Sequence, residues 1–185
     1  MNTRSLPRLL PLLLSACANA LPVAVPAALE PGRDETLAMT VAATGVQVYE
    51  CRTAAGNPGT APQWAFVAPE ARLLDAQGRA VGTHGAGPHW LADDGSRLQG
   101  QVKARSDAPA ADAIPWLLLA TTASGPRGRF SGVTSIQRIH TAGGSAPAGG
   151  CNASTSGSVA RVPYTADYRL FRSAATNQQN AYSAR

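Results

Sequence analysis

The densest group of residues capable of chemistry lies between His84 and Ser96. This stretch holds two of the three histidines of the chain, His84 and His89, together with the indole of Trp90 and the carboxylate of Asp94. An imidazole beside a carboxylate can act in general acid–base catalysis, and loops on a rigid scaffold often carry function. We therefore take His84 and Asp94 as candidate catalytic residues. The same two residues, with His89, Trp90 and Ser96, are the candidate ligand-binding residues.

The same stretch also has a structural interpretation. Its glycines and Pro88 would form a tight turn, Trp90 would pack in the core, and Asp94 would only begin a hairpin tip. As a metal site it is incomplete, because residues five apart on a strand point to opposite faces and a third ligand would have to come from His140 or Asp94. We predict no metal and no cofactor.

The functional prediction follows from the absence of a catalytic motif. The chain has no Gly-x-Ser-x-Gly motif, so a serine nucleophile in that setting is not indicated. We predict a non-catalytic binding module for a small molecule, a glycan or a protein of the cell envelope. The alternative is an extracytoplasmic, hydrolase-like enzyme that uses His84 and Asp94.

A second polar cluster lies near the carboxyl end of the chain. On a strand, Tyr164 and Tyr168 share one face and Asp167 takes the other. Tyrosine pairs of this kind pack in a core or form a platform for a sugar. Arg138, inside an otherwise apolar segment, is either an ion-pair partner of Asp167 or Glu50 or a solvated arginine at a strand edge.

The elements that must position these residues are short strands. Gly (18) and Pro (14) are frequent and only 15% of the residues are charged, which favours strands joined by turns. Residues 44–45, 75–78 and 94–95 each predict a hairpin turn. The expected strands are 37–41, 46–51, 64–67, 73–74, 80–81, 90–91, 98–105, 114–121, 130–141, 159–162 and 165–171. We predict a single all-β domain over residues 34–172, an antiparallel β-sandwich or distorted barrel of about ten strands.

Residues 97–105 show the clearest alternation in the chain. The polar set is Arg97, Gln99, Gln101, Lys103 and Arg105, and the apolar or small set is Leu98, Gly100, Val102 and Ala104. Successive side chains of a strand point to opposite faces, so we expect the whole polar set to face solvent.

The amino terminus has the pattern of an export signal. Arg4 and Arg8 precede a short leucine-rich run, and residues 14–17 (LSAC) resemble the box in which a bacterial lipoprotein is cleaved before its cysteine. We predict a signal peptide over residues 1–16 and lipidation of Cys17, with cleavage after residue 20 as the alternative. A Pro-rich tether would follow over residues 17–33, and residues 173–185 would form a flexible tail. The protein would reach the periplasm or the outer membrane as a lipoprotein, or be secreted, and would contact the membrane only through its lipid.

Two cysteines remain after the signal. Exported proteins meet an oxidising environment, so Cys51 and Cys151 form an even pair that we expect to be a disulfide.

The charge gives little reason to expect a nucleic-acid partner. The net charge of +5 falls to about +3 once Arg4 and Arg8 are removed with the signal. The remaining basic residues are scattered and are not interleaved with aromatic side chains, so we predict no binding of nucleic acid.

Several motifs together resemble one known family. They are GVQVYEC at 45–51, HGAGP at 84–88 with Trp90, DGS at 94–96, IPWLLL at 114–119, Gly143 and Gly144 with Gly150 and Cys151, and VPYTADY at 162–168. From about residue 21 to residue 172 the chain resembles the domain-of-unknown-function 3455 family of bacteria and filamentous fungi. The resemblance implies an exported β-rich domain without an established activity. Some members carry a dehydrogenase label, which we do not transfer because this chain has no Gly-x-Gly-x-x-Gly motif after a strand.

Overall fold

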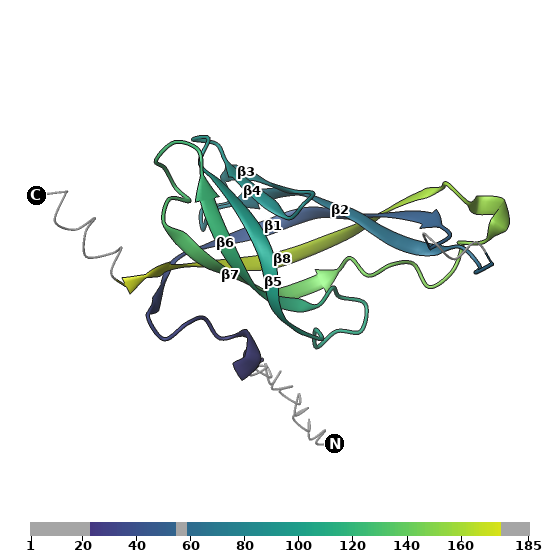
Figure 1. Cartoon of the computed structure of the whole chain (residues 1–185), viewed down its shortest axis with the longest axis horizontal. Coiled ribbons are helices and arrows are strands. Elements are labelled where there is room, and N and C mark those ends of the chain that lie inside the picture. Colours follow the sequence, from purple (N-terminus) through teal and green to yellow (C-terminus); the bar gives the residue numbers. More distant parts are fainter. Residues whose placement is uncertain (1–22, 55–58, 175–185) are drawn as a thin grey trace, which may run out of the picture.

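The chain folds into one antiparallel sheet that closes on itself as a barrel (Figure 1). The computed structural model describes residues 23–54 and 59–174. Its strands are β1 (Glu35–Arg52), β2 (Gln63–Leu74), β3 (Ala80–Gly85), β4 (His89–Ala92), β5 (Arg97–Ser106), β6 (Trp116–Ser124), β7 (Val133–Gly143) and β8 (Val159–Ser173). Each strand pairs with the next along the chain, and β8 pairs with β1. The predicted all-β class is therefore confirmed, and of the two predicted architectures the chain adopts the barrel.

Two short 3-10 helices complete the described elements, η1 (Ala27–Leu29) and η2 (Ala153–Thr155). No helix in the described part of the chain is long and apolar enough to span a bilayer. The predicted signal peptide, Cys17 and residues 175–185 of the predicted tail lie outside the described residues.

The eleven expected segments form eight strands in the described part of the chain, because three of the expected interruptions are absent. The predicted hairpin at residues 44–45 is wrong, since β1 runs through Gly45 and pairs with β2 and β8 on its two sides. A Cβ at Gly45 would lie 2.1 Å from the carbonyl oxygen of Glu70. Gly45 therefore marks a close approach of two backbones instead of a turn.

The other two merged strands are β2 and β8. β2 joins the expected segments 64–67 and 73–74, and β8 joins 159–162 and 165–171. Pro163 lies within β8, immediately before Tyr164, which is the first residue of this strand that pairs with β7. A proline is tolerated there because the pairing with β7 has not yet begun at this position. The turns predicted at 75–78 and 94–95 are confirmed, with Gly78 and Gly95 at φ 75° and 83°.

The barrel interior is filled by large side chains. Trp90, Tyr168, Phe130 and Leu73 are at most 1% exposed. Trp90 of β4 lies over Gly100 of β5, where an added Cβ would come within 2.8 Å of the indole ring.

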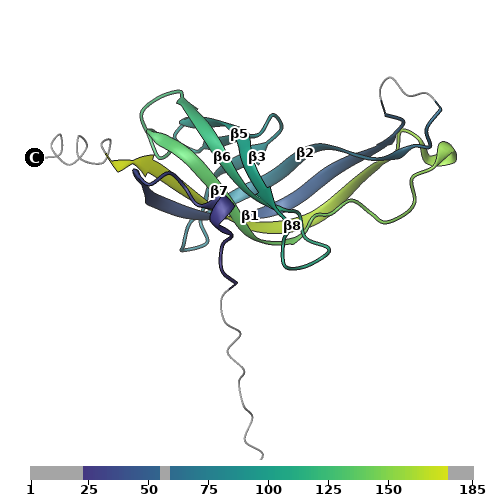
Figure 2. The same ribbon diagram turned by 60° about the horizontal axis from the view of Figure 1, so that its bottom comes forward.

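A smaller cluster holds the amino-terminal segment against the outside of the barrel. Leu29 is fully buried with Trp116, Leu118 and Ile139. Its carbonyl oxygen accepts a hydrogen bond from Nε2 of Gln137 at 2.8 Å. η1 packs against β5 and β6 on the outer surface of the barrel (Figure 2).

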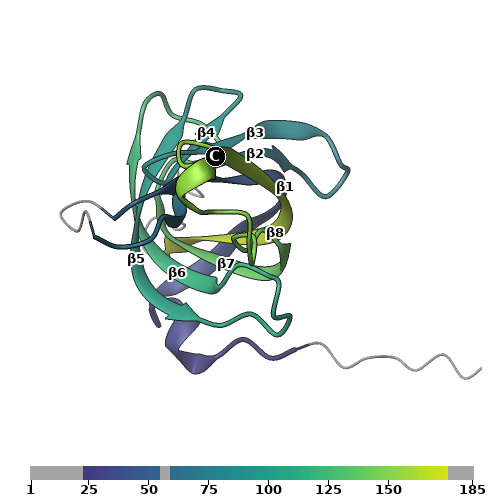
Figure 3. The same ribbon diagram turned by 90° about the vertical axis from the view of Figure 1, so that its right-hand side faces the viewer.

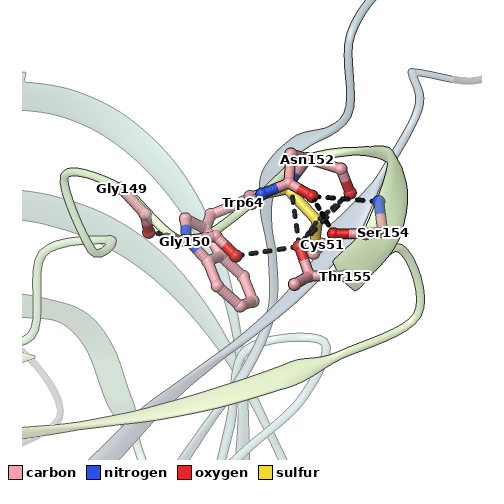
Figure 4. Close-up of a disulfide and its surroundings, with 8 residues drawn as sticks. Cys51, Trp64, Gly149, Gly150, Asn152, Ser154 and Thr155 are labelled. Atoms are coloured by element: carbon pink, nitrogen blue, oxygen red, sulfur yellow. Dashed lines mark hydrogen bonds between the residues drawn. A yellow bond between two sulfur atoms is a disulfide. The ribbon is translucent and has the colours of Figure 1, made fainter.

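Strands β1, β2 and β8 extend beyond the rest of the barrel as a three-stranded ribbon (Figure 1). At its far end Cys51 and Cys151 form a disulfide across a sequence separation of 100, which confirms the predicted pairing. Around it, Asn152 caps η2 by accepting from the amide of Ser154, and Trp64 donates to Gly149 O at 2.8 Å (Figure 4). This loop between β7 and β8 is thereby fixed to the ribbon.

The barrel wall is incomplete beside the ribbon. The short strand β3 pairs with β2 only from Ala71 to Leu74. The short strand β4 pairs with β5 only from Arg97 to Gln99. The rest of β2, from Gln63 to Glu70, pairs with β1 alone, and the later part of β5 pairs with β6 alone. An opening therefore separates β2 from β5 at the ribbon end of the barrel.

Candidate functional site

A pocket of about 450 Å³ occupies this opening and continues into the barrel. Its size falls within the range of small-molecule sites. Figure 3 looks from the ribbon end, with β5, β6 and β7 curving around one side and β2 and β3 on the other. The lining residues are Gln47, Tyr49, Phe66, Val67, Pro69, His84, Gly87, Pro88, Trp90, Val102, Arg105, Ile114, Pro115, Leu117, Leu119, Arg138 and Tyr168.

A β-bulge in β2 shapes one wall. Val48 pairs with Ala68 and Tyr49 pairs with Phe66, so Val67 has no partner of its own on β1. A bulge changes the direction of the side chains around it. Consecutive residues Phe66 and Val67, which would alternate in a regular strand, both line the pocket.

A second bulge, in β5, shapes the opposite wall. Val102 pairs with Leu119 and Ala104 with Leu118, which leaves Lys103 as the extra residue. The predicted alternation is therefore interrupted at Lys103, and Arg105 joins Val102 in lining the pocket. Arg105 is exposed as predicted, but the bulge moves it to the face opposite Arg97, Gln99 and Gln101, so the prediction of one shared polar face is wrong at this residue.

His84 and Trp90, two of the predicted site residues, lie together at the pocket. His84 is only 4% exposed, and its ring stacks on Trp90 with the centroids 4.3 Å apart. Nδ1 of His84 lies 2.8 Å from the carbonyl oxygen of His89. A carbonyl can only accept, so Nδ1 carries the proton and Nε2 is the acceptor of the neutral ring. Burial lowers the pKa of His84 to about 3, and the imidazole is therefore uncharged at neutral pH.

The other predicted site residues form turns. Oδ1 of Asp94 accepts from the amide and the hydroxyl of Ser96, and Oδ2 accepts from the amide of Arg129. These hydrogen bonds lower the pKa of Asp94 to about 2, and the bond from the Ser96 hydroxyl has the largest effect. Asp94 thus joins the hairpin tip to the segment before β7. His89 closes the β3–β4 turn by donating to Ala86 O at 2.6 Å.

The structure does not form the predicted pair of His84 and Asp94. Both residues are described, and they bind different groups: His84 binds the backbone of β4, and Asp94 binds its own turn and Arg129. Of the five predicted binding residues, His84 and Trp90 line the pocket and His89, Asp94 and Ser96 do not.

Arg138 is a pocket residue that the sequence did not identify. Its Nε and Nη2 donate to the carbonyl oxygen of Pro115 at 3.1 Å and 2.8 Å. The carboxylates expected as its partners are engaged elsewhere, Asp167 with His140 and Glu50 with Arg52. The alternation of β7 could have indicated that Arg138 faces the barrel interior. Arg138 lies two residues after the buried Ile136 and pairs with the buried Tyr168.

Several buried polar atoms around the pocket have no hydrogen-bond partner of standard geometry. Within the described part of the chain they include Nε2 of Gln47, Nε1 of Trp90 and the hydroxyls of Tyr164 and Tyr168. Burial raises the pKa of both phenols, so they remain protonated donors. Buried groups of this kind are usually satisfied, and three of these residues, Gln47, Trp90 and Tyr168, line the pocket, where a ligand could reach them.

No group of three metal-ligating side chains is arranged to hold an ion within residues 23–54 and 59–174. The fold and the site define a small antiparallel barrel with a ligand-sized, apolar-walled pocket at one end and a disulfide-closed ribbon beside it. The family model described as "Protein of unknown function (DUF3455)" matches residues 31–172, and the chain belongs to this family. No curated protein and no solved structure matches it.

Proposed function

We propose that the protein is a non-catalytic binding module of the cell envelope whose pocket takes a small molecule with a mainly apolar body. The observation that carries the proposal is where the exposed apolar side chains lie. Six large hydrophobic residues are exposed in the described part of the chain, and three of them, Phe66, Val67 and Val102, line this pocket at about half exposure. Exposed apolar surface gathered at a concave site favours a ligand that covers it.

The shape and polarity of the pocket favour a small molecule over the other predicted ligands. A protein partner needs a broad surface, whereas this apolar surface lines a pocket of about 450 Å³. A glycan needs many hydrogen-bonding partners for its hydroxyls, whereas the exposed surface of this pocket is mainly apolar, with Phe66, Val67 and Val102 at about half exposure.

The geometry favours binding over catalysis. A general base works best when its pKa lies near the operating pH, and the pKa of His84 is about 3. Its Nδ1 is also engaged by the backbone, and Asp94 does not contact it. His84 therefore supports the pocket as a neutral, stacked ring.

The binding proposal is tested with a neutral fluorescent hydrophobe, N-phenyl-1-naphthylamine, titrated into the purified protein. We expect saturable one-to-one binding, weakened about tenfold or more by Val102→Asp because the new carboxylate must be desolvated by the probe. Val159→Asp is the matched control, since Val159 is 60% exposed, against 52% for Val102, and does not line the pocket. Absence of saturable binding, or equal weakening by both substitutions, would overturn the proposal.

The envelope location is supported by the leader pattern and by the disulfide, which suits an oxidising compartment. We propose that Cys17 receives the lipid that holds the protein at a membrane. Metabolic labelling with an alkyne fatty acid should mark the wild type and leave Cys17→Ser unmarked. A labelled Cys17→Ser protein, or an unlabelled wild type, would refute the anchor.

A further inference from the structure

The ionisable side chains that line the pocket give it a one-sided charge. Two guanidinium groups, those of Arg105 and Arg138, belong to the lining, and the lining contains no aspartate or glutamate. The other titratable lining groups are His84, Tyr49 and Tyr168, and burial keeps all three uncharged at neutral pH by lowering the pKa of the histidine and raising those of the tyrosines. A ligand in this pocket therefore meets positive charge alone.

Arg138 is held in place at the pocket. It is half-buried, and its two hydrogen bonds to Pro115 O fix the plane of the guanidinium. A guanidinium has five N–H donors, so these bonds leave others for the Tyr168 hydroxyl nearby and for a ligand. The positive charge of Arg138 also opposes the rise in the pKa of Tyr49 and Tyr168. An arginine fixed in this way is prepared to bind an acceptor without losing further side-chain freedom.

Arg105 supplies a second guanidinium at the surface of the same pocket. It is exposed, and the bulge at Lys103 turns it to the pocket side of β5. Phe66, Val67 and Val102 share the lining with both arginines. The pocket thus combines an apolar wall with one fixed and one exposed cation.

The protein's own carboxylates do not neutralise these two charges. The ion pairs of the described residues join other groups, and none of them includes Arg105 or Arg138. Burying a cation without a counter-charge is unfavourable, so a half-buried and unpaired arginine in a pocket favours an anionic ligand.

We propose that the ligand is an amphipathic monocarboxylate, with its apolar chain or ring against Phe66, Val67 and Val102 and its carboxylate at Arg138 and Arg105. The inference rests on the binding function proposed above. A carboxylate matches the planar, paired N–H groups of a guanidinium, and a single negative charge suits one fixed arginine with an exposed second one.

The experiment compares three probes that differ only in the head group: decanoate, 1-decanol and decylammonium. Each is titrated into the purified protein by calorimetry. We expect the wild type to bind decanoate about 10- to 100-fold more tightly than 1-decanol, because a charge-assisted hydrogen bond replaces a neutral one, and to bind decylammonium most weakly. Arg138→Gln should lower the affinity for decanoate, so that the preference for decanoate over 1-decanol falls to the two- to fivefold that Arg105 supplies.

Two further variants keep the test decisive if Arg138→Gln does not fold, which circular dichroism will show. Arg105→Gln, an exposed position, should reduce the preference for decanoate about two- to fivefold. Arg97→Gln changes the charge of the same strand outside the pocket lining and should leave the preference unchanged.

The outcomes separate the two proposals. Equal binding of decanoate and 1-decanol by the wild type would overturn carboxylate recognition while leaving the apolar binding function in place. Failure of all three probes to bind would overturn the binding function and this inference with it. An equal loss of preference in Arg97→Gln and Arg105→Gln would show that overall charge, and not the pocket, selects the anion.

Discussion

The buried, uncharged state of His84 predicts how the stability of the barrel depends on pH. Its pKa is about 3 in the folded protein and returns to about 6.5 when the chain unfolds, because the ring regains water. Between these two values the unfolded state binds one proton more than the folded state. The free energy of unfolding should therefore be unaffected by His84 above about pH 7 and should fall as the pH drops below about 6.5.

The magnitude follows from the width of this window. Well inside this window each pH unit lowers the free energy of unfolding by about 1.4 kcal/mol, and about 2.3 kcal/mol is lost between pH 6.5, where the slope is half of this, and pH 4.5. Carboxylates contribute mainly at lower pH. Asp94, whose folded pKa is about 2, stabilises the fold above the unfolded value near 3.9, and this contribution is lost as the pH falls towards 2.

The assay is urea unfolding followed by tryptophan fluorescence, at half-unit steps from pH 7.5 to pH 4.5, for the wild type and His84→Asn. The asparagine amide can still donate to His89 O but does not titrate. We expect the variant to lose the slope that His84 gives the wild type. Equal slopes, or an NMR titration in which the His84 ring of the folded protein becomes charged near pH 6, would refute the reasoning.

Three further perturbations test the fold. Reducing the disulfide should lower the free energy of unfolding by about 4.7 kcal/mol in the chain-entropy model, since it closes a loop of 100 residues, and the urea midpoint measures this. Gly100→Ala places a Cβ 2.8 Å from the ring of Trp90 and should destabilise the barrel by about 1–3 kcal/mol in the same assay. Leu29→Ala, at a fully buried position, should cost about 2–5 kcal/mol, whereas Val23→Ala, at a position 53% exposed, should change stability by less than about 0.5 kcal/mol.

Each of these has a result that would contradict it. An unchanged urea midpoint after reduction would mean that the disulfide restricts the unfolded chain very little. A Gly100→Ala protein as stable as the wild type would mean that Trp90 does not pack tightly over β5. Equal effects of Leu29→Ala and Val23→Ala would mean that η1 is not part of the cooperative fold.

Much of the barrel could be predicted because strands and their turns have local signals. Alternation and the Asp-Gly and Gln-Gly turns gave the correct hairpins at 94–95 and 75–78. The turn predicted at Gly45 is wrong because glycine is favoured both in turns and where two backbones approach closely. Only the position of the neighbouring strand distinguishes these two cases. The choice between sandwich and barrel depends on the long-range pairing of β1 with β8, for which the sequence carries no local signal.

Two of the five candidate binding residues lie at the pocket. His84 and Trp90 were identified from residue type, and both line the pocket. Asp94 lies in its hairpin tip and outside the pocket lining, because the Asp-Gly dipeptide that attracted attention as a carboxylate is the one that forms the turn. Arg105 was predicted on the same face as Arg97, Gln99 and Gln101, but a bulge shifts the alternation by one residue, and nothing in the local pattern marks Lys103 as the extra residue.

The short hairpin of β3 and β4 has a kinetic consequence. Because β2 and β5 are not bridged beside the pocket, a molecule can reach its interior without breaking any strand pairing. Association should then be a single step whose observed rate rises linearly with ligand concentration, without the plateau that a slow conformational gate imposes. Ligands of different affinity would differ mainly in residence time, so the dissociation rate alone would set how fast one bound ligand replaces another.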